Sequence, residues 1–306
     1  MQRIQRAWNS AAANPVDAAQ RIIAVSKTIA WAELEEWQKD NEYILEGYRR
    51  TQNSWKDTFH SVFAYVHNET VNIHSHLWGA VLFVYLIVTF PSYIRRFPEA
   101  TWIDVAVACV FLSSAVFCLS ASAFYHAASS HSYSVARRCH ALDYSGVVVL
   151  TVGSFYPSLY YGFYGDARMQ AAYISGITLI GIGAAYVVLS PEYSKPTHRG
   201  TRTSVFIALG LCAVVPVAHW FFTHGASTLL LDMGYGWLVA SGALYIAGAL
   251  IYANRIPERY SPGTFDYYLS SHQIFHVCVV LAALAHLAGV RKSIEYTYAG
   301  RLHRGM

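Results

Sequence analysis

Seven stretches of the chain contain no Asp, Glu, Lys or Arg, and this feature restricts the fold more than any other. Each stretch is at least 22 residues long, whereas a helix needs roughly 20 apolar residues to cross a bilayer. The stretches cover residues 70–94, 105–136, 144–165, 169–191, 203–231, 233–254 and 267–290. A large soluble helical bundle is the alternative, but seven consecutive stretches with such short joints disfavour it. We therefore predict an all-α polytopic membrane protein with seven transmembrane helices, because a helix bonds its own backbone polar groups in lipid.

Composition supports this prediction. Charged residues make up 13% of the chain, about half of the roughly 25% found in soluble domains. We divide the chain into a cytosolic N-terminal region with amphipathic helices (1–68), a seven-transmembrane domain (69–291) and a short extracytosolic tail (292–306). The predicted spans are about 71–93, 103–127, 139–161, 169–190, 203–224, 234–254 and 267–290.

The distribution of Lys and Arg predicts the orientation. With the N-terminus inside, the inner segments hold 15 of these residues and the outer segments hold 7. The positive-inside rule therefore favours a cytosolic N-terminus. We expect the protein in the plasma membrane or an endomembrane. No basic cluster lies among base-stacking aromatic residues, so nucleic acid is not an expected partner.

The N-terminal region carries two patterns. Residues 27–50 are charged and amphipathic, and they predict a helix followed by a connector. From Trp55 to Val66 the aromatic and aliphatic residues recur at helical spacing. This second pattern predicts an interfacial helix that lies on the membrane surface before the first span, although packing on the bundle would produce it equally well.

Ionisable residues within spans are costly in lipid and are therefore candidates for function. Ser122 and His126 lie four residues apart near the end of the second span, and Asp143 lies near the start of the third. His272 and His276 lie four residues apart at the start of the seventh. A spacing of four places both side chains on one helix face. Counting crossings brings all five residues to the same side of the membrane.

Three neutral imidazoles with one open position are typical of a catalytic zinc site, so we predict Zn²⁺ bound by His126, His272 and His276. Asp143 and Ser122 are the candidate catalytic residues beside it. Each has a simpler interpretation. Asp143 could pair with Arg137 or Arg138 or cap its helix, and Ser122 could bond back to a helix carbonyl.

Six runs of sequence resemble the progestin and adipoQ receptor family, which is related to haemolysin III, and its adiponectin receptor and fungal branches most closely. The runs are HNETVNIHSHLWGA, SAFYHAASSHS, LDYSGV, GSFYPSLYYGFY, SPEYSKP and SSHQIFHVCVV, within residues 40–290. The resemblance implies seven helices, a cytosolic N-terminus, zinc on the same three histidines, Asp143 positioning the bound water and Ser122 close by. His74 departs from the family, which more usually has an aromatic residue there.

Three functions follow as hypotheses. The preferred one is a receptor-like, zinc-dependent lipid amide hydrolase that cleaves ceramide or a related sphingolipid of the membrane, a substrate class taken from the resemblance. The second is a receptor for an extracellular protein ligand, acting in lipid or zinc homeostasis, in which zinc is structural. A transporter is less favoured, because the ionisable cluster lies at one face and charged residues do not continue through the bundle.

Overall fold

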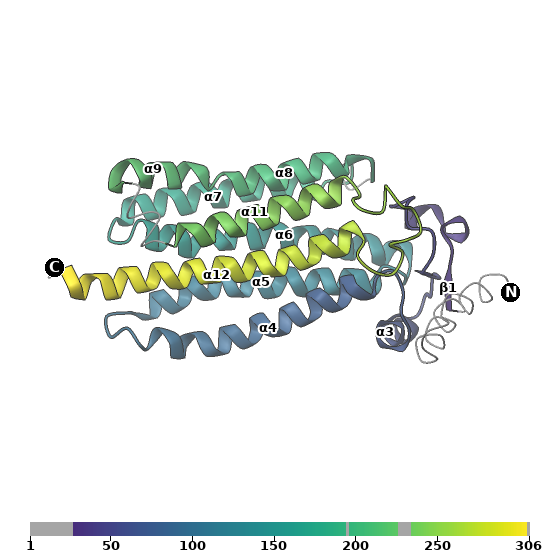
Figure 1. Cartoon of the computed structure of the whole chain (residues 1–306), viewed down its shortest axis with the longest axis horizontal. Coiled ribbons are helices and arrows are strands. Elements are labelled where there is room, and N and C mark those ends of the chain that lie inside the picture. Colours follow the sequence, from purple (N-terminus) through teal and green to yellow (C-terminus); the bar gives the residue numbers. More distant parts are fainter. Residues whose placement is uncertain (1–26, 194–195, 226–233, 305–306) are drawn as a thin grey trace.

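The computed structural model describes residues 27–193, 196–225 and 234–304, and its long helices run side by side in one bundle (Figure 1). The spanning helices are α4 (Thr70–Ile94), α5 (Trp102–Ala128), α6 (Tyr133–Gly162), α7 (Ala167–Val188), α8 (Arg199–Leu211) continued by α9 (Val214–His224), α11 (Tyr235–Ala253) and α12 (Ser271–Arg304). A short 3-10 turn, η3 (Pro196–His198), precedes α8.

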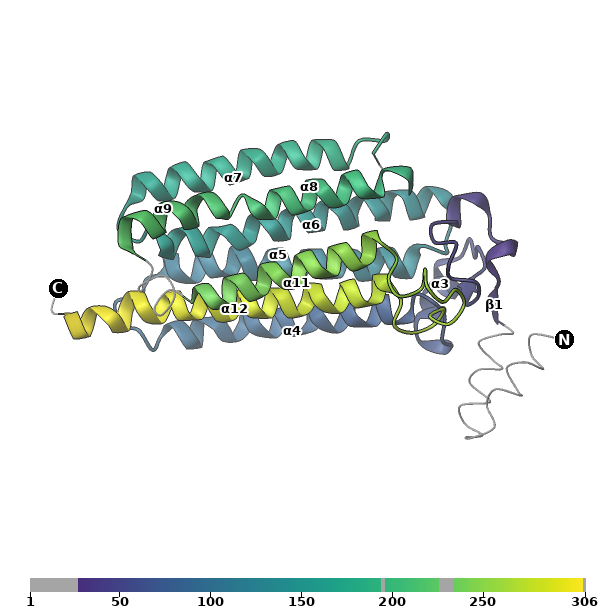
Figure 2. The same ribbon diagram turned by 45° about the horizontal axis from the view of Figure 1, so that its top comes forward.

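Six of these helical segments are long and apolar enough to cross a membrane, counting α8 and α9 as one. The exception is α6, which has charged residues in its first turns and many Tyr, Ser and Gly residues later. It nevertheless lies inside the bundle alongside the others (Figure 2). The predicted helical membrane fold is therefore confirmed, with α6 as the seventh helix.

The two largest differences from the predicted spans lie at helix ends. The third span was expected to start at residue 139, but α6 starts at Tyr133. The last helix, α12, continues to Arg304 through the segment predicted as a tail. Charged residues excluded these segments from the predicted spans, but nothing in their backbone prevents a helix from continuing into the membrane interface and beyond.

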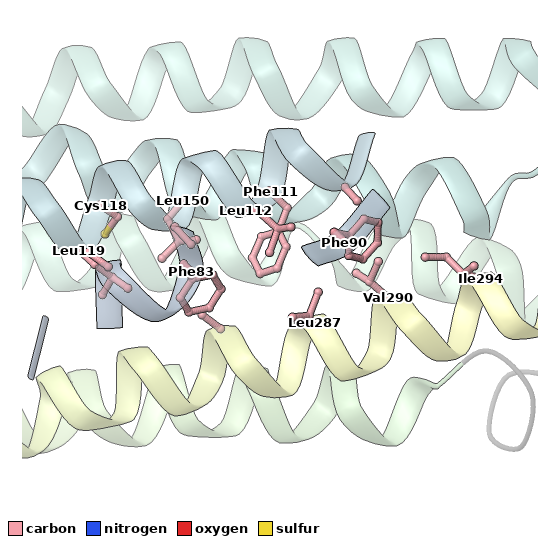
Figure 3. Packing of buried hydrophobic residues seen from close by; sticks show 14 of the residues in the cluster. Phe83, Phe90, Phe111, Leu112, Cys118, Leu119, Leu150, Leu287, Val290 and Ile294 are labelled. Carbon is pink, nitrogen blue, oxygen red and sulfur yellow. The ribbon is translucent and has the colours of Figure 1, made fainter. Parts of the chain in front are cut away.

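The helices form a closed ring. Neighbouring pairs follow the order α4, α5, α6, α7, α8, α11 and α12, and α12 returns to contact α4 and also reaches α6. The main hydrophobic core lies among α4, α5, α6 and α12, where Phe83, Phe111, Leu112 and Leu119 are completely buried. Figure 3 shows these side chains between the ribbons, with Leu287 and Val290 of α12 beside them. This shared core fixes the position of α5 relative to α12.

Helices α5 and α6 make an unusually close contact at Gly146. A Cβ atom on this residue would lie 2.9 Å from the Cα atom of Cys118, which is closer than real Cβ contacts. Small residues at such positions let membrane helices pack backbone against backbone. The contact lies about one turn from both Ser122 and Asp143, so it sets the distance between them.

The fifth span is interrupted between α8 and α9. Pro216 lies near the start of α9, and proline has no N–H group to bond to the carbonyl four residues earlier. The backbone resumes with Val217 donating to the carbonyl of Ala213 at 3.2 Å. This proline accounts for the break.

The prediction of a helix over residues 27–50 is wrong. This segment contains an antiparallel pair, β1 (Thr28–Ile29) with β2 (Tyr48–Arg49), and two 3-10 turns, η1 (Trp31–Glu33) and η2 (Glu36–Gln38). Its backbone groups bond within these strands and turns and also to distant parts of the chain. For example, the N–H of Leu45 donates to Asp266 at 2.8 Å. Residues 1–26 lie outside the described part of the chain.

The predicted helix before the first span is confirmed as α3 (Trp55–Ala64), capped by Ser54, whose hydroxyl accepts from the N–H of Asp57 at 3.3 Å. Trp55, Phe59 and Phe63 are exposed along it. The strands and α3 lie at one end of the bundle, and α12 ends at the other (Figure 1).

Candidate metal centre

The end of α5 and the start of α12 meet at the same end of the bundle as α3. His126 lies two residues before the end of α5, and His272 is the second residue of α12. His276 follows one turn later on the same face. Tertiary packing therefore brings together the three histidines predicted from sequence.

The three imidazoles converge through their Nε2 atoms. The Nε2 atom of His272 lies 3.1 Å from that of His126 and 3.1 Å from that of His276. All three ligand atoms lie within 4.8 Å of one another. A tetrahedral zinc ion with Zn–N bonds of about 2.0–2.1 Å separates its nitrogen ligands by about 3.3 Å. The triad has the donor type and spacing to hold such an ion.

Contacts on the opposite ring nitrogens fix the tautomers of two of these histidines. The Nδ1 atom of His126 lies 2.7 Å from a carboxylate oxygen of Glu69, and the Nδ1 atom of His276 lies 3.0 Å from the carbonyl oxygen of Asn72. Because these oxygens only accept hydrogen bonds, each Nδ1 carries the proton. In the neutral rings, each Nε2 then presents a lone pair to the centre of the triad. Outer contacts of this kind are typical of metal-ligating histidines.

Ser122 and Asp143 lie beside the triad. Ser122 is buried one turn before His126 on α5, and Asp143 is half-buried on α6. The Ser122 hydroxyl interacts with the Asp143 carboxylate, which also lies within electrostatic range of His126. No ion pair of Asp143 with Arg137 or Arg138 occurs among the described residues, which disfavours the simpler interpretation of this carboxylate.

A large cavity connects these residues with the middle of the bundle. It has a volume of about 1640 Å³, and all five predicted site residues line it. Beyond the triad its wall is mainly aliphatic and aromatic, and it extends along α12 as far as Ser293. Ser293 is 17 residues beyond His276, which corresponds to about 25 Å of helix. The cavity is therefore long, apolar and polar at one end.

The other histidines lie outside the triad. His286 bonds to the carbonyl of Ser154 at 2.8 Å, deeper in the bundle. His74 bonds to the carbonyl of Val62 at 3.0 Å, so the departure from the family pattern leaves the triad unaffected.

Sequence reasoning missed three residues of α4 and its cap. Glu69 accepts from the amide of Asn72 at 2.7 Å as well as contacting His126. The Nε2 atom of His76 lies 3.2 Å from the carbonyl of His276. Residues 69, 72 and 76 recur at helical spacing where a span begins, and this polar stripe was the available signal.

Comparison with known proteins identifies the family of this chain. The model of the family described as Haemolysin-III related matches residues 64–287. The ADIPOR-like receptor IZH2 of Saccharomyces cerevisiae is 36% identical, over 96% of this chain and 92% of its own length. Progestin and adipoQ receptor-like protein 1 of Caenorhabditis elegans is 38% identical over 86% of this chain. The adiponectin receptor protein of Drosophila melanogaster is 37% identical over 88% of this chain.

This chain spans 60% of the length of the nematode and fly proteins, but nearly the whole yeast protein. The family match covers more than half of the chain and includes all five predicted site residues. The resemblance seen in the sequence is confirmed, and the chain is an integral membrane protein that belongs to the haemolysin-III related family, with adiponectin-receptor-like proteins among its relatives.

Proposed function

We propose that this chain is a receptor-like membrane protein with zinc-dependent lipid amide hydrolase activity of the ceramidase type. The observation that supports this proposal is the convergence of three Nε2 lone pairs at the polar end of a long apolar cavity. A purely structural or solvent-exposed metal site would not need such a cavity.

A zinc ion bound by the triad would supply a Lewis acid and lower the pKa of its water toward neutrality. In the reaction, a bond forms between the water oxygen and the amide carbon, and the amide C–N bond breaks. Asp143 would accept the proton of the attacking water and deliver it to the departing amine. Ser122 would donate to the Asp143 carboxylate and orient it before this transfer. Once Asp143 is protonated, the Ser122 hydroxyl would donate instead to the oxygen on which negative charge develops.

The shape of the cavity supports a lipid substrate. One polar end would hold the amide group, and the apolar wall would bury an acyl chain and keep bulk water away from it. Ceramide or a related sphingolipid has this combination of groups, and hydrolysis would release a fatty acid and a sphingoid base. We further propose that the protein lies in the plasma membrane or an endomembrane, with its N-terminus on the cytosolic side.

The contacts of the triad also favour a second candidate, a receptor with structural zinc. The ion would tie α5 to α12, and Glu69 would join the start of α4 to the same centre. An extracellular ligand, such as a protein, would then act by shifting these helices.

The experiment compares purified wild type with D143N and H272A. The hydrolase proposal predicts that D143N retains one zinc per chain and releases little fatty acid from ceramide in micelles. H272A should lose both zinc and activity. If wild type with a full complement of zinc hydrolyses no ceramide, the hydrolase proposal is wrong. If D143N then shows the same response to an extracellular ligand as wild type does, the receptor with structural zinc is favoured.

A further inference from the structure

Arg49 is buried although it lies outside the membrane spans. Its residue is 3% exposed, and its guanidinium reaches the last turn of α5. One nitrogen, Nη1, donates to the carbonyl of Ala127 at 2.9 Å, and the other, Nη2, donates to the carbonyl of His126 at 2.5 Å. The same two nitrogens donate to Ser61 at 3.0 Å and Ser129 at 3.1 Å. Arg49 therefore bonds the backbone of a predicted metal ligand directly.

The location explains why a buried cation is tolerated. The last four carbonyls of a helix have no partner within the helix, and they carry the negative end of its dipole. Burial lowers the pKa of Arg49 to about 10, so the guanidinium remains protonated at neutral pH. Its planar fork can bond two carbonyls at once, which a lysine ammonium cannot do with the same geometry.

The chain after Arg49 stays attached to the residues that directly follow α5. The N–H of Gln52 donates to the carbonyl of Ser130 at 2.9 Å, and the N–H of Asn53 donates to the carbonyl of His131 at 2.8 Å. The extramembrane segment thus follows the end of α5 for several residues, and the position of this end depends on it.

His126 is consequently held at two points by residues that precede the first span. Glu69 holds its ring through Nδ1 at 2.7 Å, and Arg49 holds its backbone carbonyl. His272 and His276 belong to a single helix and keep their spacing by themselves. His126 comes from a different helix, so the geometry of the triad depends on how the end of α5 is placed.

We infer that Arg49 is a positioning residue of the metal centre, which aligns His126 with the two histidines of α12. This inference rests on the metal site of the proposed function, but not on the reaction assigned to it. A ligand that is already aligned costs less ordering when the ion binds, so loss of the alignment should weaken metal binding.

Arg50 provides a matched control. It is the next residue, it has the same charge, and it is exposed, with Glu33 at 3.7 Å as its ion-pair partner. Substituting Arg50 changes the charge of the segment equally without touching α5. Any effect that is specific to Arg49 must therefore come from its buried contacts.

The test measures zinc affinity of the full chain in detergent, by competition with a chelator, for wild type, R49Q, R49K and R50Q. We expect R49Q to bind zinc about 10–100-fold more weakly, as with other outer contacts of metal ligands. R49K should fall between R49Q and wild type, and R50Q should match wild type. Thermal unfolding of the metal-free proteins identifies losses that reflect general destabilisation.

A double-mutant cycle with E69Q provides a second measurement. If both residues act through His126, the loss of affinity in the double variant should be smaller than the product of the single losses. Wild-type zinc affinity in R49Q or R49K would overturn the inference, and so would equal losses in R49Q and R50Q. If wild type binds zinc but hydrolyses no lipid, the proposed reaction is wrong. The zinc affinities of the variants would still test the role of Arg49.

Discussion

The imidazole of His76 lies flat against that of His276, with ring centroids 3.7 Å apart and planes inclined by 12°. His76 is 3% exposed and also contacts the carbonyl of His276 through Nε2. It belongs to α4, which contributes no residue to the triad. The stacked ring therefore limits the tilt of His276 from a third helix.

We predict that H76A weakens zinc binding about 10-fold, because it removes both the stacked ring and the hydrogen bond. H76F, which restores a flat ring, should recover part of the affinity. Isothermal competition with a chelator measures both. H74F is the control, since His74 lies two residues away and bonds to Val62 outside the triad. An H76A variant with unchanged affinity would show that the stacking has no role in binding.

The close contact at Gly146 predicts a requirement for a small residue. A leucine side chain there must displace the α5 backbone at Cys118, so G146L should cost about 1–3 kcal/mol in the free energy of unfolding. It should also separate Ser122 from Asp143 and reduce hydrolysis more than zinc content. Chemical denaturation and metal analysis measure the two effects. At Gly183 of α7 an added Cβ meets nothing within 4 Å, and G183L should retain wild-type stability.

Glu258 determines where α12 starts. Its side chain is 0% exposed, accepts from the N–H of Ser271 at 2.8 Å and the hydroxyl of the same residue, and accepts from Asn41 at 3.1 Å. E258A would leave these donors unpaired next to His272. We expect a loss of about 1–3 kcal/mol in the free energy of unfolding, measured by thermal or denaturant unfolding. E42Q, at an exposed carboxylate on the same side, should have no effect; equal losses would contradict the capping role.

Removal of the metal should lower the melting temperature. An ion that binds only the folded chain stabilises it by about 2.7 kcal/mol when its free concentration is 100 times Kd. We therefore expect a chelator to reduce the melting temperature of wild type and added Zn²⁺ to restore it. In H272A neither treatment should change the melting temperature. A metal-dependent shift that persists in this variant would indicate that the ion binds elsewhere.

Several features of this protein followed from the sequence alone. The charge-free stretches predicted the helices of the bundle, because length and apolarity decide whether a helix can cross a bilayer. The spacing of His272 and His276 predicted a shared face, which depends only on helix geometry. Counting crossings brought His126 to the same end of the bundle. These inferences needed only local periodicity and the alternation of direction from span to span.

Other features could be decided only by tertiary contacts. The segment of residues 27–50 has the charge pattern of a helix, yet its Arg49 side chain bonds to the end of α5 and its backbone bonds to the loop before α12. These partners are distant in sequence. For the same reason the sequence did not reveal that Glu69 contacts the ring of His126 and that Arg49 bonds its carbonyl. Both contacts exist only because the end of α5 packs next to these two residues. The sequence determined which residue types and helix faces are present at the metal end of the bundle. Packing decided which lone pairs converge and which groups hold them, because those distances depend on how separate helices meet.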